Sequence, residues 1–292
     1  MERNSKTEAD VPGSGSRGML ARIWEQVSTL LLAIVIAFTI RTFIIEPFRI
    51  PSPSMLPTLL IGDHLFVNKF AFGARVPFTE IRLPGFREPE RGDVVVFSVA
   101  RGVGSGIPRI YPADHRPDLP RDDFVKRIVG LPGDRLEVRN NRVYVNDSLV
   151  ALGEGEGVFE DASGHGLEIQ REYLDGCEHA VLNDPYIPGQ RKSAVVIPAG
   201  RYFMMGDNRD HSNDSRMWGT VRLEEIQGPA FILYWSWSVN GNFLQFLNPV
   251  NWWSAEKRWN RIFSPIRCAE PGESLADVGV DGSSVTRSPE GS

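Results

Sequence analysis

The stretch "DRLEVRNNRVYVND", residues 134–147, indicates how this chain folds. Apolar and charged or polar side chains alternate over residues 135–139 and again over 142–145, and the pair Asn140–Asn141 separates the two runs. Strict alternation is typical of a half-buried β-strand, and a short Asn-containing loop between two such runs is typical of a hairpin. The stretch therefore predicts two antiparallel strands.

Similar signals lie on both sides of this hairpin. No segment between residues 60 and 235 has a long helical period, whereas β-branched and aromatic runs recur between Gly, Pro, Asn and Asp. We therefore predict a mainly β fold built from antiparallel sheets. Residues 149–192 are Gly- and acid-rich with weak periodicity, so we expect a loop-dominated segment there. The predicted strand runs are 63–70, 92–99, 123–131, 193–206 and 228–237.

An apolar segment precedes the β-rich part. Residues 27–40 carry no charge, and continuing past Arg41 to Ile45 approaches the roughly 20 residues that span a bilayer. Arg41 could snorkel to the headgroups, with Trp24 at the other interface. A buried core helix should show caps and a polar stripe, and a cleaved signal peptide needs a small-x-small site, but neither is visible. We predict an uncleaved transmembrane anchor.

The residues before the anchor predict its orientation. Arg3, Lys6, Arg17 and Arg22 favour a cytoplasmic N-terminus when basic residues alone are counted, which places everything after residue 45 outside. Residues 1–18 are polar and Gly/Ser-rich, and we expect them to be disordered.

The composition of the 292-residue chain excludes several classes of protein. With 41% hydrophobic and 24% charged residues it is an ordinary globular chain, and a net charge of −5 gives no nucleic-acid footprint. Two cysteines, Cys177 and Cys268, make neither a zinc site nor a disulfide scaffold, and whether they pair stays open. We predict no metal, no cofactor and no nucleic-acid partner. The five histidines are scattered without metal-ligand spacing: His64, His115, His165, His179 and His211.

Two serines and one lysine are candidates for nucleophilic chemistry. Ser52 and Ser54 stand in "IPSPSMLPTL", residues 50–59, just beyond the anchor. A serine hydroxyl needs a base, and lysine serves as one when burial or nearby positive charge lowers its pKa. Lys126 stands in an apolar strand run, which would desolvate its amine, although a half-exposed lysine is the commoner outcome. A Ser-His-Asp triad also stays open, because its members need not be adjacent in sequence.

Two further segments have more than one interpretation. The polar cluster "MGDNRDHSNDSRMWG", residues 205–219, is by itself typical of a solvated turn, and its carboxylates do not match a calcium loop. Residues 242–267 mix Trp and Phe with Arg and Lys, which is compatible with contact to a membrane interface and with packing on the core.

Taken together and in order, the anchor, "PSPSMLPTL" (51–59), "RGDVVVF" (91–97), "KRIVGLPGD" (126–134) and "GDNRDHSNDSR" (206–216) resemble the bacterial type I signal peptidase (leader peptidase) family. The resemblance covers roughly residues 25–237. It implies a membrane-anchored serine endopeptidase that removes signal peptides from exported preproteins at the outer face of the cytoplasmic membrane. The alternatives are an inactive anchored β-domain that binds envelope partners, and a related Ser–Lys self-cleaving protease.

The resemblance also implies residue roles. Ser54 matches the nucleophile, Lys126 the general base, and Ser52 the serine whose hydroxyl holds the oxyanion together with the Ser54 N–H. Ser212 matches a serine that orients the lysine amine. Pro53 departs from the glycine frequent at this position. Matching structural positions near the site are Asp207, Arg209, Asp214 and Arg216. Matching positions of the small apolar pockets, which favour Ala-x-Ala substrates, are Phe48, Ile50, Pro51, Leu59, Phe124 and Val125.

The same resemblance divides the chain and names its partners. It predicts a cytoplasmic tail, an anchor, a catalytic β domain in two parts, a smaller inserted β subdomain and a disordered tail. The partners are preprotein signal peptides, the lipid bilayer and, indirectly, the Sec/Tat export machinery. In the same order the predicted ranges are 1–22, 23–45, 46–133 with 199–268, 134–198 and 269–292.

Overall fold

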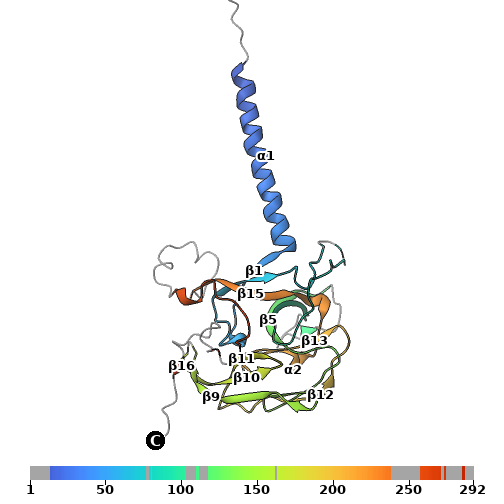
Figure 1. The fold of residues 1–292 in the computed structure, drawn as a ribbon, viewed down its shortest axis with the longest axis vertical. Helices are drawn as coiled ribbons and strands as arrows, with labels where there is room; N and C mark the ends of the chain where they lie inside the picture. Colours follow the sequence, from blue (N-terminus) through green and yellow to red (C-terminus); the bar gives the residue numbers. More distant parts are fainter. Residues whose placement is uncertain are drawn as a thin grey trace, which may run out of the picture.

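An apolar helix stands apart from a β-sheet body in the computed structural model (Figure 1). The structure describes residues 14–76, 79, 81–102, 110–111, 118–161, 163–237, 257–270, 273 and 285–286. Helix α1 spans Ser14–Phe43, and its 23-residue part Ala21–Phe43 is long and apolar enough to cross a membrane, with none of it buried by the rest of the protein. The mainly β fold with an N-terminal apolar helix is confirmed.

The helix begins earlier than expected. Residues 14–18, for which disorder was predicted, form its first turns, because extending an existing helix needs no new nucleus. The predicted disorder is wrong there, while residues 1–13 lie outside the described part. Strand β1 begins at Ile45, directly after the helix, so the chain passes from the apolar segment straight into a sheet.

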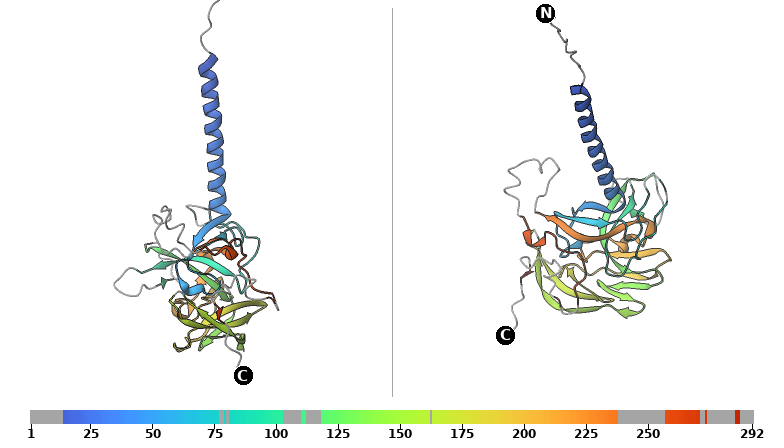
Figure 2. Two further views of the ribbon diagram at one scale, coloured as in Figure 1. Left: turned by 90° about the vertical axis from the view of Figure 1, so that its left-hand side faces the viewer. Right: turned by 45° about the horizontal axis from the view of Figure 1, so that its top comes forward.

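The largest described sheet has eight strands. Its order of neighbours is β1-β2-β15-β3-β5-β13-β14, and β4 pairs with β3. Its pairs are antiparallel. Figures 1 and 2 show α1 leaving the body on the side of β1 and β15, with β9 and β12 at the other end. The strands are β1 (Ile45–Arg49), β2 (Asp63–Asn68), β3 (Val94–Arg101), β4 (Ile110–Tyr111), β5 (Arg121–Gly130), β13 (Arg201–Met205), β14 (Val221–Arg222) and β15 (Ile226–Ser236).

The predicted hairpin is confirmed and belongs to a second sheet. Val138 pairs with Val143 across a turn in which Asn140 and Asn141 have φ values of 50° and 63°. Asparagine tolerates this left-handed region, which a two-residue hairpin loop of this kind requires. The sheet order is β12-β6-β7-β8, with β6 (Arg135–Arg139), β7 (Arg142–Val145), β8 (Ser148–Leu149) and β12 (Lys192–Val196).

A third sheet replaces the loop-dominated segment predicted for residues 149–192. Its order is β11-β10-β9-β16. The register of β10 against β9 shifts near Gln170, and such irregularities break the alternation on which the prediction depended. Apolar side chains including Leu167, Ile169 and Leu182 nevertheless form one buried cluster with Leu56. The strands are β9 (Ala151–Glu160), β10 (Gly166–Leu174), β11 (Cys177–Asn183) and β16 (Val285–Thr286).

Two more predictions differ from the structure in detail. The run 193–206 is not one strand: it divides at Pro198 and Gly200 into β12 and β13, because Pro lacks an N–H and Gly200 has a φ of 68°. In the tail predicted to be disordered, β16 pairs with β9 and Ala269 N donates to Glu178 O. Residues 242–256 of the aromatic segment lie outside the described part of the chain, as do 271–272, 274–284 and 287–292.

Residues 50–60 lie between two buried clusters. Leu56 and Leu60 pack toward the third sheet, whereas Met55 and Leu59 pack into a cluster with residues of β2, β3 and β15. Packing on both sides fixes this short segment against the body. The short helices near it are η1 (Pro53–Met55), α2 (Ser215–Trp218), η2 (Leu223–Glu225) and η3 (Trp259–Arg261).

Candidate active site

Ser54 lies in the one-turn helix η1 and is held there by the polar loop that follows β13. Ser54 is 7% exposed. Its carbonyl accepts from Asn208 N at 3.2 Å, and the Pro53 carbonyl accepts from Asn208 Nδ2 at 3.2 Å. Pro53 at the start of the turn restricts φ, which suits a helical first position. Backbone and side chain of one asparagine therefore fix the segment that carries Ser54.

Lys126 reaches Ser54 from the large sheet. Its Nζ lies 2.5 Å from Ser54 Oγ and donates to Val125 O at 2.9 Å. Lys126 stands in β5 between β3 and β13, opposite Val95, and is 3% exposed. The Phe124 ring lies beside the amine, with its centroid 5.8 Å from Nζ. The apolar strand context seen in the sequence thus buries the amine against the serine hydroxyl.

The surroundings of Lys126 lower the pKa of its amine. Burial, which penalises the charged ammonium, lowers its pKa from 10.5 to about 8, with a further lowering from the positive charge of Arg216. Asp214 and Asp207 act in the opposite direction but do not outweigh burial. At pH 7 roughly a tenth of the amine is then neutral, compared with well under a thousandth for an ordinary lysine.

Two other serines flank the pair. Ser52 Oγ lies 3.3 Å from Ser54 Oγ. It is therefore close enough to contact a group that becomes bonded to Ser54 Oγ. Ser212 is buried beside Gly206: a Cβ on Gly206 would fall 2.3 Å from Ser212 Oγ and 2.4 Å from Ser54 O, so glycine is needed for this close approach. Ser212 Oγ has no hydrogen-bond partner among the described residues, so the predicted bond to Lys126 is not formed in this structure.

The predicted ion pair in the polar loop is present. Arg216 donates from Nε and Nη2 to the two carboxylate oxygens of Asp214 at 2.8 and 2.7 Å, with both residues buried. Asp214 also caps α2 and accepts from Gly206 N at 3.0 Å. Although burial raises the pKa of Asp214, Arg216 outweighs this and holds the pKa below its usual value. A carboxylate that stays charged fixes the loop next to Ser212.

The other two loop residues pair with partners that the sequence analysis did not identify. Asp207 accepts two bonds from Arg127, at 2.8 and 2.7 Å, and one from Thr58 Oγ1 at 2.6 Å. Arg209 binds Glu172 of β10, with the shortest contact at 2.5 Å. The signal for Arg127 was present in the sequence, because a second charged residue stands beside Lys126 in a strongly apolar strand run.

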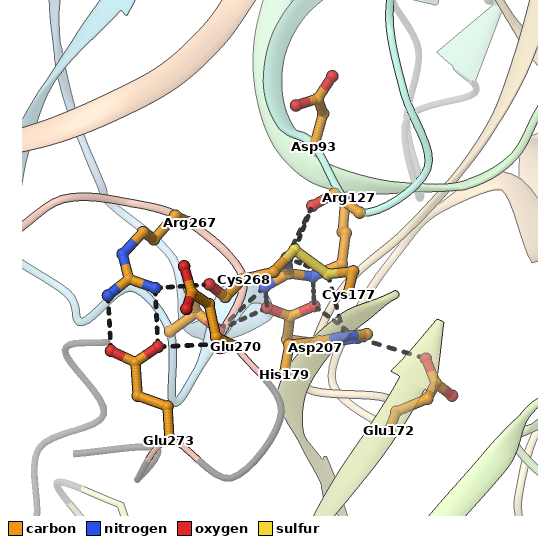
Figure 3. Close-up of a disulfide and its surroundings, with 12 residues drawn as sticks. Asp93, Arg127, Glu172, Cys177, His179, Asp207, Arg267, Cys268, Glu270 and Glu273 are labelled. Carbon is orange, nitrogen blue, oxygen red and sulfur yellow. Dashed lines mark hydrogen bonds and ion pairs between the residues drawn. A yellow bond between two sulfur atoms is a disulfide. The ribbon is translucent and has the colours of Figure 1, made fainter. Parts of the chain in front are cut away.

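A disulfide joins Cys177 of β11 to Cys268, which answers the question left open by the sequence. Figure 3 shows the Arg127 guanidinium between this disulfide and the Asp207 carboxylate. Arg127 Nη1 lies 4.0 Å from each sulfur and donates to Gly92 O at 2.8 Å. The disulfide therefore packs against the guanidinium of the buried Arg127–Asp207 pair.

The residues predicted to line the substrate pockets are divided between two side-chain clusters and the protein surface. Phe48, Ile50, Leu59 and Val125 belong to a single cluster, and Phe124 belongs to the neighbouring one. Pro51 is exposed. Leu59 has no exposed surface and therefore supports the cluster from within. The side chains of Phe48, Phe124 and Val125 are only partly buried.

The geometry supports nucleophilic chemistry by a serine and a lysine. In the described part of the chain, the side-chain contacts of Ser54 Oγ are Lys126 and Ser52, and no histidine takes part, so the triad alternative is not supported. The two nearby carboxylates, Asp207 and Asp214, are each engaged by an arginine.

Comparison with known proteins gives a consistent result. Residues 23–235 match the family described as signal peptidase, peptidase S26. The chain is 39% identical over 219 residues to Signal peptidase I of Pseudomonas aeruginosa, with 69% of each chain covered. It is 38% identical over 221 residues to Signal peptidase I of Pseudomonas fluorescens, again with 69% of each covered. With Signal peptidase I of Aquifex aeolicus the identity is 33% over 258 residues, covering 77% of this chain and 90% of the relative. The chain therefore belongs to the signal peptidase family, peptidase S26.

Proposed function

We propose that this protein is a membrane-anchored serine endopeptidase that cleaves N-terminal signal peptides from exported preproteins, with Ser54 as nucleophile and Lys126 as general base. The observation that carries the residue assignment is the 2.5 Å contact between Lys126 Nζ and Ser54 Oγ. Membership of the signal peptidase family supports the substrate class.

The reaction proceeds in two halves. Neutral Lys126 takes the Ser54 proton as Oγ attacks the scissile carbonyl carbon, and the resulting ammonium gives that proton to the leaving amine. The signal peptide is then held as an ester on Ser54. Lys126, neutral again, takes a proton from water, the water oxygen attacks the ester carbonyl, and Ser54 Oγ leaves with the proton.

The oxyanion that forms in each half is held by the Ser54 N–H and the Ser52 hydroxyl in this proposal. The 3.3 Å separation of the two serine Oγ atoms supports it, since the developing charge lies next to Ser54 Oγ. Pro53 has no N–H, but neither donor depends on that residue. Ser212 orients the Lys126 amine when substrate draws the two together in this proposal. The burial of Ser212 beside Gly206, which also borders the Ser54 carbonyl, supports this role.

The proposed specificity is for small residues before the cut, of the Ala-x-Ala type. The side chains of Phe48, Ile50, Pro51, Leu59, Phe124 and Val125 would form or support shallow apolar pockets. A methyl group fits such a pocket, whereas a larger side chain would clash with walls that are already packed.

The proposed location is the cytoplasmic membrane, crossed once by α1, with the catalytic part on the extracytoplasmic side. The short step from Phe43 to Ile45 supports this, because it brings β1 to the membrane surface where the substrate's own signal helix ends. Contacts with lipid and, indirectly, with the Sec/Tat machinery belong to the same proposal. So does the division into a catalytic domain of residues 46–133 and 199–268 and an inserted subdomain of 134–198.

Cleavage of a preprotein with an Ala-x-Ala site by the purified full-length protein tests the proposal. Ser54→Ala should abolish cleavage while leaving thermal unfolding unchanged, and Ser148→Ala, an exposed serine in β8, serves as the matched control. Cleavage by Ser54→Ala at the wild-type rate would reject the nucleophile. Absence of cleavage by the folded wild type would favour an inactive anchored β-domain.

A further inference from the structure

Three side chains of the metal-ligating type meet outside the Ser54–Lys126 pair, although their segments are far apart in the sequence. His165 ends the turn between β9 and β10, Asp184 follows β11, and His211 stands in the loop after β13. The Nε2 atoms of His165 and His211 lie 2.9 and 3.1 Å from the same oxygen, Asp184 Oδ2. One ligand atom from each of the three residues lies within 4.8 Å of the others.

Hydrogen bonds behind these side chains fix the carboxylate. Asp184 Oδ1 accepts from Tyr186 N at 2.9 Å, which leaves Oδ2 to face the two rings. Asp184 N donates to Asp210 Oδ2 at 2.9 Å, so the backbone of Asp184 is tied to the residue directly before His211. The carboxylate therefore presents Oδ2 to both imidazole rings.

The turn that carries His165 is also built by hydrogen bonds. Asp161 Oδ1 accepts from His165 N at 3.0 Å and from Ser163 N at 2.8 Å. Outer contacts that orient ligands in this way are typical of protein metal sites.

Exposure and donor type indicate which ion fits. The Asp184 side chain is 3% exposed, whereas those of His165 and His211 are each 37% exposed, so the corner is closed behind and open to water in front. Two imidazole nitrogens and one carboxylate oxygen suit Zn²⁺, which takes three protein ligands and a water in its open tetrahedral sites. Bonds of about 2.0–2.1 Å place tetrahedral ligand atoms roughly 3.3 Å apart. The two contacts with Asp184 Oδ2 therefore need to open by a few tenths of an ångström, and the two imidazole nitrogens, which lie within 4.8 Å of each other, must take the same spacing.

We propose that His165, Asp184 and His211 form a Zn²⁺ site, with water as the fourth ligand, that ties the loop preceding Ser212 to the third sheet. The ion takes no part in peptide-bond cleavage. It adds to two existing ties of the same loop, the Arg209–Glu172 pair and the backbone bonds of Leu182 with Asp207 and Arg209. Because it binds the folded arrangement of three separate segments, Zn²⁺ stabilises the native state.

Calorimetric titration of the untagged, chelator-treated full-length protein in detergent with zinc chloride tests this. We expect one Zn²⁺ per chain, with affinity weakened by about tenfold or more in His165→Ala, Asp184→Asn and His211→Ala, since removing even an outer partner of a ligand costs that much. His64→Ala is the matched control, because His64 of β2 contacts the carbonyl of Gly62 and belongs to no such cluster in the described part of the chain. It should bind as the wild type does.

A second measurement covers the case in which a variant folds poorly. The unfolding temperature of the wild type and of His64→Ala should rise with added zinc chloride, whereas that of His165→Ala should not. His165 is in a partly exposed turn, so this variant should match the zinc-free wild type in circular dichroism. Binding of equal strength in His165→Ala and wild type, or no saturable binding to the wild type, would overturn the proposal and leave a hydrogen-bonded cluster.

Discussion

Two neighbours on β5, Lys126 and Arg127, are both almost fully buried, yet their surroundings are opposite. Successive residues of a strand point to opposite faces, so one side chain reaches Ser54 and the other reaches the disulfide. Arg127 has a two-bond partner in Asp207, whereas the hydrogen bonds of Lys126 within the described structure go to a hydroxyl and a carbonyl.

The difference shows two ways in which a protein buries a basic side chain. A guanidinium cannot lose its proton at ordinary pH, so it must be paired, and Arg127 is. An ammonium without a close carboxylate is relieved by losing its proton, which suits Lys126 to the proposed role of base. The charge pairs around Ser54 and Lys126 therefore fix the loop, while the Lys126 amine is the group to which the proposed mechanism assigns proton transfer.

The test with the largest expected effect replaces the lysine of this pair of neighbours with an arginine. Lys126→Arg keeps the positive charge but not the ability to become neutral, so we expect cleavage of a preprotein to fall by about 10⁴-fold or more, as when one member of a nucleophile–base pair is lost. Single-turnover kinetics measures this. A variant that keeps more than a tenth of wild-type activity would show that Lys126 is not the base.

A second test compares stability after removal of each charge. Arg127→Met leaves Asp207 buried and unpaired, so we expect a loss of about 3–5 kcal/mol in the free energy of unfolding. Lys126→Met removes an amine whose pKa is lowered by burial from 10.5 to about 8, a shift that corresponds to a cost of about 3 kcal/mol at pH 7. After loss of its two hydrogen bonds, a net gain of about 1–2 kcal/mol is expected.

Urea unfolding at pH 7 measures both variants. The double variant Arg127→Met with Asp207→Leu is the control, and it should recover most of the stability lost by Arg127→Met because no unpaired charge remains. Equal destabilisation by Lys126→Met and Arg127→Met would contradict the difference drawn between the two neighbours.

The disulfide beside Arg127 provides the third test. Cys177 and Cys268 are 91 residues apart, and closing a loop of that length restricts the unfolded chain. Cys177→Ala with Cys268→Ala should therefore lower the free energy of unfolding by about 2–4 kcal/mol. Dithiothreitol should destabilise the wild type similarly and have no effect on the double variant. An unchanged unfolding midpoint in the double variant would mean that packing around Arg127 holds this region without the bond.

The sequence predicted what depends on local pattern. Alternating apolar and polar residues on both sides of an Asn pair predicted the hairpin of β6 and β7 correctly. The apolar strand run around Lys126 likewise predicted that its amine is buried. The third sheet was missed because a register shift near Gln170 and interspersed glycines hide its alternation. Its burial depends on Leu56 and Leu60, which come from a distant segment.

Partners that depend on tertiary structure were beyond the reach of the sequence. The resemblance placed Asp207 and Arg209 in one loop, but their ion-pair partners Arg127 and Glu172 come from β5 and β10. The cysteine pair could not be assigned, since no local spacing reports the distance between β11 and the C-terminal segment. For the same reason His165 and His211 looked scattered, although the fold brings both to one oxygen of Asp184.

The smallest expected effect is in the pH dependence of cleavage. The active form has a neutral Lys126, so kcat/KM should rise about tenfold per pH unit below the pKa of about 8 and level off above it. An ordinary lysine would continue to rise to about 10.5. Burial is the largest cause of the shift, and Phe124 covers the amine, so Phe124→Ala should admit water and move the midpoint upward. A wild-type midpoint near 10.5 would contradict the role of burial, because the amine would then titrate as if it were in water. A midpoint near 8 that Phe124→Ala leaves unmoved would mean that residues other than Phe124 bury the amine.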